Sequence, residues 1–280
     1  MNTSRSRRRP RNVVSNVIVA VFCVVWLFPI YWMVSTSFKT PGNIVSTTPQ
    51  FFPQPFTLEN YVGAIQKPGF LTSLGNSVLV TVIVTVATVL LGFFAAAALT
   101  RLRFPGRQAI VVVLLAVQMI PGAAILIPLF LTFRDLGLLN SYVGLCLAYT
   151  ATVLPFGIVV LRGFFQAIPM ELEEAARIDG AGETRLLRSI YFPLVLPGVI
   201  SCSAFAFIAA WNDYIVAYVL LQEQDRYTLP VWLVSFSTNV GTDYGGIVAG
   251  SALFAVPVVV FFMILQRKLV TGMSAGAVKG

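Results

Sequence analysis

Long apolar runs separated by short polar segments dominate this chain. Each of the six longest runs reaches or exceeds about 20 residues, the length at which a helix crosses a bilayer core of about 30 Å. The pattern therefore predicts six membrane-spanning helices in an all-α protein, with the ends of each placed to within several residues. They lie at about residues 13–38, 74–100, 109–133, 141–161, 195–221 and 245–266.

Three prolines lie inside the third and fourth predicted spans, at Pro121, Pro128 and Pro155. Membrane helices tolerate proline where neighbouring helices supply partners for the carbonyl groups that it leaves free. We therefore expect kinks at these positions rather than helix ends, and two continuous spans.

Composition supports a membrane protein. Only 11% of the residues are charged and 57% are hydrophobic, whereas a soluble domain carries about 25% charged residues. Histidine is absent, which removes the commonest general base and the commonest metal ligand. Cys23, Cys146 and Cys202 stand singly in apolar runs, a pattern typical of small core residues rather than of a metal site or a disulfide framework.

The basic residues predict the orientation of the spans. With six spans both termini face the same side, and the segments on that side hold 15 of the 19 Lys and Arg residues. Such an excess marks the cytoplasmic side of a membrane protein. We therefore expect both termini in the cytoplasm, and the net charge of +8 reflects topology rather than nucleic-acid binding.

Three regions follow from this topology. Residues 1–12 form a basic cytoplasmic N-terminus, residues 13–266 the six-span domain, and residues 267–280 a cytoplasmic tail. The first apolar run is too long for a signal peptide, and no small-residue cleavage pattern follows it, so we expect a retained helix.

The longest cytoplasmic loop, residues 162–194, is unusually polar for its place between two apolar spans. Pro169 suits the first turn of a helix, and the acidic residues that follow it favour the positive end of the helix dipole. Glu173 precedes Arg177 by four residues, the spacing of a stabilising pair. Asp179-Gly180 is a typical helix end, so the loop predicts a helix, a glycine turn and a second short helix that Pro193 closes.

The first of these helices carries the adjacent residues Ala175 and Ala176 between acidic and basic side chains. This small patch would let another backbone approach closely, and the charged rim would fix its register. The alternative is an amphipathic helix that rests on lipid headgroups, although its acidic residues suit an anionic membrane poorly.

The loop also resembles a known motif. From Glu174 it reads E-A-A, three residues, Gly180, nine residues, Ile190, one residue, and then Phe192-Pro193. This spacing is similar to the EAA loop of ABC-importer permeases, which usually ends in Leu-Pro. The resemblance implies a type I ABC-importer permease fold whose coupling helix docks on an ATP-hydrolysing subunit. The coupling residues that it implies are Glu173, Glu174, Ala175, Ala176, Asp179, Gly180, Ala181, Ile190 and Pro193.

Further stretches narrow the resemblance to carbohydrate-importer permeases, and among them to the maltose-type second permease. They are FPIYWMVSTSFK at 28–39, TLENY at 57–61, RLRFPGR at 101–107, LPF at 154–156, AWNDY at 210–214 and GMSAGAVKG at 272–280.

This resemblance implies a permease subunit in the cytoplasmic membrane of a prokaryote that translocates a disaccharide or oligosaccharide. Its implied partners are a second permease, two ATPase subunits and an extracytoplasmic sugar-binding protein. ATP and Mg would be bound by the ATPase subunits, and this chain would hold no cofactor or metal. Glycerol-phosphate-type importers use similar permeases and are the alternative within the family.

One carboxylate lies within a predicted span. Asp213 falls in the fifth span, where an ionised group costs about 2.5–3.5 kcal/mol on insertion scales, so it should face a partner or a water-filled path. With Asn212 it would either line the sugar route or tie helices together. Gln118 and Tyr149 are weaker candidates for the route.

Other functional classes find little support in the sequence. The chain has no G-x-x-x-x-G-K-[ST] phosphate loop and no catalytic constellation, so we expect a non-catalytic subunit. A stand-alone secondary transporter usually has paired broken spans or several intramembrane ionisable groups, and here only Asp213 qualifies. The C-terminal SAGAVKG segment would either be a frayed end or contact the ATPase.

Overall fold

The chain is mostly helical in this computed structural model, which describes residues 13–239 and 241–276. Within these residues five helices are long and apolar enough to cross a membrane, and a sixth span is counted when one sharply bent helix pair is taken together. The long helices are α1 Val13–Ser37, α4 Phe70–Arg101, α7 Tyr142–Gln166, α10 Phe192–Asn212 and α13 Tyr244–Gly276. The bent pair is α5 Arg107–Val117 and α6 Gly122–Asp135.

The third predicted span is broken rather than kinked, so that expectation was wrong. The axes of α5 and α6 differ by 101° across residues 118–121. Pro121 has no backbone N–H and disfavours a helical conformation in the residue before it, so a chain at this point turns more easily than it continues. Pro128 and Pro155, by contrast, lie inside α6 and α7 as expected.

The fifth predicted span also ends early. α10 stops at Asn212, Asp213 adopts an extended backbone conformation, and a short helix, α11 Ile215–Leu220, follows. Asp213 therefore lies in a break between two helices, and its expected position inside one continuous helix was wrong.

Helices α4, α7 and α10 form the centre of the molecule. Small residues allow close approach here: a Cβ atom on Gly157 of α7 would lie 2.9 Å from the Cys202 sulfur and 3.1 Å from a Thr88 methyl group. Cys146 and Cys202 are buried in this region as expected. Cys23 is instead exposed, because α1 lies largely outside the central bundle.

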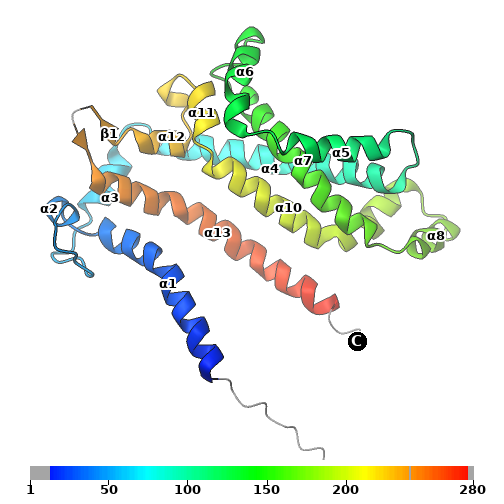
Figure 1. The fold of residues 1–280 in the computed structure, drawn as a ribbon, viewed down its shortest axis with the longest axis horizontal. Coiled ribbons are helices and arrows are strands. Elements are labelled where there is room, and N and C mark those ends of the chain that lie inside the picture. Colours follow the sequence, from blue (N-terminus) through cyan, green and yellow to red (C-terminus); the bar gives the residue numbers. More distant parts are fainter. Residues whose placement is uncertain (1–12, 240, 277–280) are drawn as a thin grey trace, which may run out of the picture.

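Helix α1 lies apart from α4, α7 and α10 (Figure 1). Helix α13 packs on α10, where the Phe207 and Phe261 rings stack 3.8 Å apart and the Trp211 indole donates to the Phe254 carbonyl at 3.3 Å. The two helices α1 and α13 have neighbouring ends beside α3 and then diverge. In the most apolar stretch of α1 no residue is buried within the chain, so its surface is available to lipid or to another protein. α13 continues to Gly276, past the predicted end of the span at residue 266, and the last residues of the expected tail, 277–280, lie outside the described residues, as does the basic segment 1–12.

Two groups of short elements lie at opposite ends of the bundle (Figure 1). At one end, called here the hairpin end, are the elements between α1 and α4 and between α11 and α13. They are α2 Pro41–Ile44, α3 Glu59–Gln66, the 3-10 turn η2 Gln224–Arg226, α12 Leu229–Val234, β1 Ser237–Thr238 and β2 Gly241–Thr242. The two strands are antiparallel, with Ser237 opposite Thr242.

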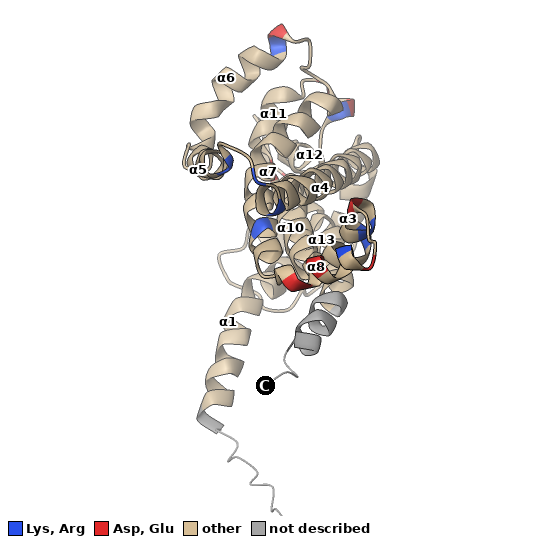
Figure 2. Ribbon diagram, turned by 90° about the vertical axis from the view of Figure 1, so that its right-hand side faces the viewer, with Lys and Arg blue, Asp and Glu red and all other residues tan. Residues whose placement is uncertain are grey.

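At the other end, called here the α8 end, lies the polar loop between α7 and α10. It contains α8 Met170–Ile178, α9 Glu183–Arg185 and the π-helix η1 Leu186–Tyr191. The predicted interruption at Pro193 is absent from this described segment, because η1 runs directly into α10 with Pro193 in its first turn. Charged side chains gather in this loop and at helix ends, whereas the described part of α1 shows none (Figure 2).

Candidate functional site

The polar loop folds as the predicted helix and glycine turn. α8 begins after Pro169 and ends at Ile178, and Gly180 follows with a φ of +78°, a left-handed conformation that favours glycine. The Ala181 backbone N–H donates to the Ala176 carbonyl at 2.9 Å and closes the turn. The EAA-like segment therefore forms a short helix with a defined end.

Glu173 is the buried residue of α8, with 7% of its surface exposed. Its carboxylate lies 3.0 Å from an Arg177 nitrogen on the same helix and 3.4 Å from Arg101 Nε at the end of α4. Burial alone would raise the pKa of Glu173, but the nearby Tyr191 hydroxyl and the two guanidinium groups outweigh it and hold the pKa below its ordinary value. Arg177 also pairs with Glu183 of α9 at 2.6 Å, which links α8 to the segment after the glycine turn.

Arg101 makes contacts that the sequence reasoning missed. One of its terminal nitrogens donates to the carbonyls of Phe165 and Ile168 at 3.1 and 3.0 Å, where α7 ends. Its guanidinium carbon lies 5.4 Å from the centre of the Tyr191 ring in η1. In the sequence Arg101 was one of the basic residues that orient the spans, and nothing nearby in the chain distinguished it from Arg103.

The two alanines of the motif face different surroundings. Ala175 is exposed, whereas Ala176 is half-buried against the apolar cluster that includes Leu186 and Phe165. The expected outward Ala-Ala patch is therefore wrong, because adjacent helical residues point about 100° apart. The outer surface of α8 instead presents Ile178, which is 86% exposed.

The other predicted coupling residues divide in the same way. Glu174, Asp179, Gly180 and Pro193 are exposed, whereas Ala181 and Ile190 are partly buried and pack against the chain's own core. The buried position of Glu173 suits a residue that holds α8 in place more than one that a partner would touch.

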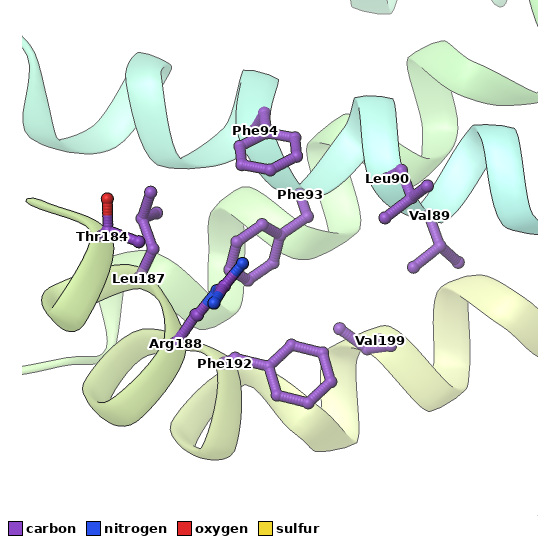
Figure 3. Close-up of a pocket in the computed structure, with 9 residues that line it drawn as sticks. All are labelled: Val89, Leu90, Phe93, Phe94, Thr184, Leu187, Arg188, Phe192 and Val199. Atoms are coloured by element: carbon purple, nitrogen blue, oxygen red, sulfur yellow. The ribbon is translucent and has the colours of Figure 1, made fainter.

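Two cavities separate α4 from parts of the loop. The larger has a volume of about 410 Å³ and is mainly apolar, with Arg188 extending into the space near Phe93 and Phe192 (Figure 3). The smaller, about 200 Å³, lies beside Glu173 and Arg101. Phe94 and Leu187 line both, so the contact between α4 and the loop is incompletely packed along this side.

Asp213 and Tyr149 are brought together at the break after α10. The Asp213 Oδ1 atom accepts a hydrogen bond from the Tyr149 hydroxyl at 2.8 Å and from the backbone N–H groups of Val216 and Ala217 at 3.0 and 3.3 Å. Asp213 therefore caps α11 and ties it to α7. Of the two alternatives for this residue, the geometry favours the helix contact.

The other two candidates for the route lie apart from this contact. Asn212 is exposed beside Asp213, and Gln118 is exposed at the α5–α6 break, where its amide donates to the Leu114 carbonyl of its own helix at 3.4 Å. Among the described residues, no group of three or more His, Cys, Asp or Glu side chains is placed to hold a metal ion.

Comparison with protein families gives one match over most of the chain. Residues 88–275 match the family described as binding-protein-dependent transport system inner membrane component. This region includes α7, α8, α10, the part of α4 from Thr88 onward and nearly all of α13.

Several named proteins are similar over nearly their whole length. The diacetylchitobiose uptake system permease protein DasC of Streptomyces coelicolor is 42% identical, over 95% of this chain and 96% of its own. The trehalose transport system permease protein SugB of Mycobacterium tuberculosis is 36% identical, over 91% and 93%. The trehalose/maltose transport system permease protein MalG of Thermococcus litoralis is 33% identical, over 96% and 96%.

A solved structure shows the same arrangement of helices. A chain of a bacterial ABC transporter involved in the import of the acidic polysaccharide alginate matches with a TM-score of 0.79 and 25% identity. The match covers 95% of this chain and 99% of that one.

Proposed function

The chain belongs to the family of binding-protein-dependent transport system inner membrane components, and from that premise we propose that it is a permease subunit of an ABC importer for a sugar. The named relatives support a small uncharged carbohydrate, because diacetylchitobiose, trehalose and maltose are all disaccharides. The cargo proposed here is therefore a disaccharide or a short oligosaccharide.

The proposed complex contains four further subunits: a second permease, two ATPase subunits and an extracytoplasmic sugar-binding protein. The α8 end faces the cytoplasm and the hairpin end faces outward, in keeping with the excess of basic residues on the side of the termini. ATP and Mg are bound by the ATPase subunits, and this chain is the non-catalytic membrane part.

The exposed surface of α8 is the observation that carries this proposal. One side of the helix is held to the spans through Glu173, while Ile178 and Leu172 are 86% and 48% exposed at the polar end of the molecule. An apolar side chain that projects into water from a rigid, charged helix is typical of a docking surface. The ATPase subunit is the proposed partner of this surface, with Glu174, Asp179 and Gly180 around it.

In the proposed mechanism, closure of the ATPase subunits on ATP moves α8 as a rigid body and with it the membrane helices. The permease then changes from an inward-facing to an outward-facing arrangement that receives sugar from the binding protein. ATP drives this change only to the extent that the ATPase contacts favour one arrangement over the other.

The test is affinity purification of the tagged chain from its native membranes in mild detergent, followed by mass spectrometry. We expect a second multi-span permease and an ATPase subunit to be recovered with it. Recovery of the chain alone or as a homo-oligomer, under conditions that preserve other membrane complexes, would refute the proposal.

A pair of variants locates the docking surface. Ile178→Asp should retain the second permease and lose most of the ATPase subunit, because a carboxylate replaces an apolar contact. Val45→Asp is the matched control, since Val45 is 64% exposed at the hairpin end. This control should retain the ATPase subunit at the wild-type level.

A further inference from the structure

Arg101 joins three helices through one side chain. It is the last residue of α4, its guanidinium donates to the Phe165 and Ile168 carbonyls at the end of α7, and it pairs with Glu173 of α8. The last carbonyls of a helix lack partners further along that helix. The Phe165 carbonyl also accepts from the Ile168 N–H at 3.3 Å, and Arg101 adds a charged donor to it and to the Ile168 carbonyl.

The covalent route from α8 to the next span is less direct. It passes through the left-handed Gly180 and then through the six-residue π-helix η1 before α10 begins. Glycine turns are conformationally permissive, and π-helical turns are rare and frequently found at functional sites. A displacement of α8 therefore has a direct path to α4 through the Arg101–Glu173 contact, whereas along the chain it reaches α10 through this turn and π-helix and reaches α7 through residues 167–169.

Side-chain packing reinforces this link only in part. Phe93 and Ala97 of α4 belong to the apolar cluster that includes Leu186 and Tyr191 of η1. Phe93 also borders the cavity of about 410 Å³, and Ala97 and Tyr191 border that of about 200 Å³. Apolar contacts are non-directional, whereas the hydrogen bonds from Arg101 to the Phe165 and Ile168 carbonyls orient its guanidinium group. Its contact with Glu173 at 3.4 Å is an ion pair without a hydrogen bond, and it adds charge attraction between α4 and α8.

From these observations we propose that Arg101 is a positioning residue, which transmits movement of α8 to α4 and α7 and thereby sets how much sugar is transported for each ATP hydrolysed. Glu173 is its partner on α8, and Tyr191 lies against its guanidinium. This inference rests on the proposed function, since it assigns a role within ATP-driven import.

The experiment compares variants of the complete transporter, reconstituted with its binding protein in liposomes, by measuring sugar uptake and ATP hydrolysis in the same samples. In Arg101→Met the complex should assemble and hydrolyse ATP, while sugar transported per ATP falls about tenfold, within the range of effects known for coupling residues. Glu173→Gln keeps the shape of the side chain without its charge and should lower the ratio by a smaller factor, about threefold.

Arg103→Met is the matched control. It removes a guanidinium two residues away that forms no ion pair within the described part of the chain, and the ratio of sugar to ATP should stay at the wild-type value. Arg101→Lys keeps the charge but not the planar group. Its ratio of sugar to ATP should therefore lie between those of Arg101→Met and the wild type.

Two results would overturn the inference. In the first, Arg101→Met and Glu173→Gln both transport the wild-type amount of sugar per ATP. In the second, Arg101→Met fails to assemble while Glu173→Gln keeps the wild-type ratio, which would make Arg101 a residue of folding alone. A wild-type chain that carries no ATPase subunit is a separate outcome, because it refutes the proposed function before any variant is compared.

Discussion

The two ends of the helical bundle hold their loops by different interactions. At the α8 end, charged side chains form a connected set in which Glu173 meets Arg101 and Arg177. At the hairpin end, neutral amide groups bind backbone carbonyls: Asn60 donates to the carbonyls of Ser37 and Lys39 at 2.9 and 2.7 Å. The buried contacts of the α8 end include paired charges, whereas the buried contacts of the hairpin end are mainly hydrogen bonds from neutral side chains to the main chain. The Arg226–Glu223 pair of the hairpin end is more exposed.

Further neutral side chains at the hairpin end donate hydrogen bonds to backbone carbonyls. The Asn76 amide donates to the carbonyls of Asp225 and Tyr227 at 2.9 and 3.0 Å, and the Trp232 indole donates to the Pro68 carbonyl at 3.0 Å. These bonds join α4, α12 and the segments beside them, and they hold the two loops of this end together.

The difference follows from how the two interactions depend on distance. A neutral hydrogen bond weakens steeply when its geometry is lost, whereas the attraction between two charges falls only as the inverse of their separation. The hairpin end is therefore suited to a surface of constant shape. At the α8 end, the attraction between Arg101 and Glu173 continues to draw α4 and α8 together when α8 is displaced.

A buried lysine at the hairpin end shows the same difference between the two ends. The Lys39 side chain is fully buried, its nitrogen lies 4.1 Å from the centre of the Trp32 ring, and the Thr36 hydroxyl is its hydrogen-bond partner at 3.4 Å. Burial lowers the pKa of Lys39. This buried lysine is held by an aromatic ring and a neutral hydroxyl, where the largely buried Arg101 has a carboxylate.

Among the changes that test this difference between the two ends, Glu173→Ala should have the largest effect. The change leaves Arg101 largely buried without its carboxylate, and breaking such a pair costs about 3 kcal/mol. Hydrogen exchange of the α8 amides should accelerate accordingly, with little change at the hairpin end. Glu171→Ala, in the exposed first turn of α8, is the control and should leave exchange nearly unchanged. Equal protection of the α8 amides in Glu173→Ala and Glu171→Ala would show that the ion pairs of Glu173 do not hold α8 in place.

A somewhat smaller effect is expected from Asn60→Ala at the opposite end. Two carbonyls at the end of α1 lose their donor in a buried site, at a cost of about 2 kcal/mol. Hydrogen exchange should accelerate in α1 and α3 and not in α8. Asn43→Ala is the control, since Asn43 is half-buried and its side-chain amide makes one exposed bond, to the Gln54 carbonyl. Acceleration in α8 would show that the two ends are not independent.

A third, smaller effect is expected from Asp213→Asn. The amide oxygen still accepts from Tyr149 and Val216, and only the stronger bonds of the charged form are lost, about 1 kcal/mol. The thermal unfolding midpoint of the purified complex should fall slightly. Asp135→Asn, which breaks an exposed pair with Arg134, should leave it unchanged. A large loss from Asp213→Asn would indicate that the charge itself matters.

A change of pH between 8 and 5 should have the smallest effect on the exchange protection of α8. The folded-state pKa of Glu173 lies below its ordinary value of 4.5, so its contribution is complete above that value and is lost as the pH falls through the lowered pKa. Exchange protection of α8, corrected for intrinsic exchange rates, should be constant from about pH 8 to 5. Arg101, Arg177 and Tyr191 face this carboxylate. The pKa of Arg177 is raised by its bonds to Glu183 and Glu173, and the pKa of Tyr191 is raised by burial and by Glu173, so neither group titrates in that range. Loss of protection between pH 8 and 6 would contradict the assigned ion pairs.

Much of the membrane topology could be predicted from the chain alone. The predicted first, second, fourth and sixth spans correspond to α1, α4, α7 and α13, because an uninterrupted apolar run of sufficient length has few alternatives to a helix in a bilayer. The third and fifth spans were predicted less well. Hydropathy registers the apolar character of residues 109–133 and 195–221, but not whether the backbone continues as a helix across Pro121 or Asp213.

The polar loop shows the same limit at the level of side chains. Its helix, its glycine turn and the Glu173–Arg177 pair were predicted and confirmed, since each depends on residues within one or two helical turns. The contact of Arg101 with Glu173 joins residues 72 positions apart, and no local pattern indicates it.

The sequence by itself determined the interactions that act over a few residues: the apolar runs, the side that carries the basic residues, and the helix that Gly180 ends. Only the tertiary structure decided which face of α8 is buried, which arginine holds it, and whether Asp213 lies in a helix or a break. The physical reason is that helix formation and membrane insertion depend on neighbours along the chain, whereas the pairing of a buried charge depends on whichever group the packed helices bring to it.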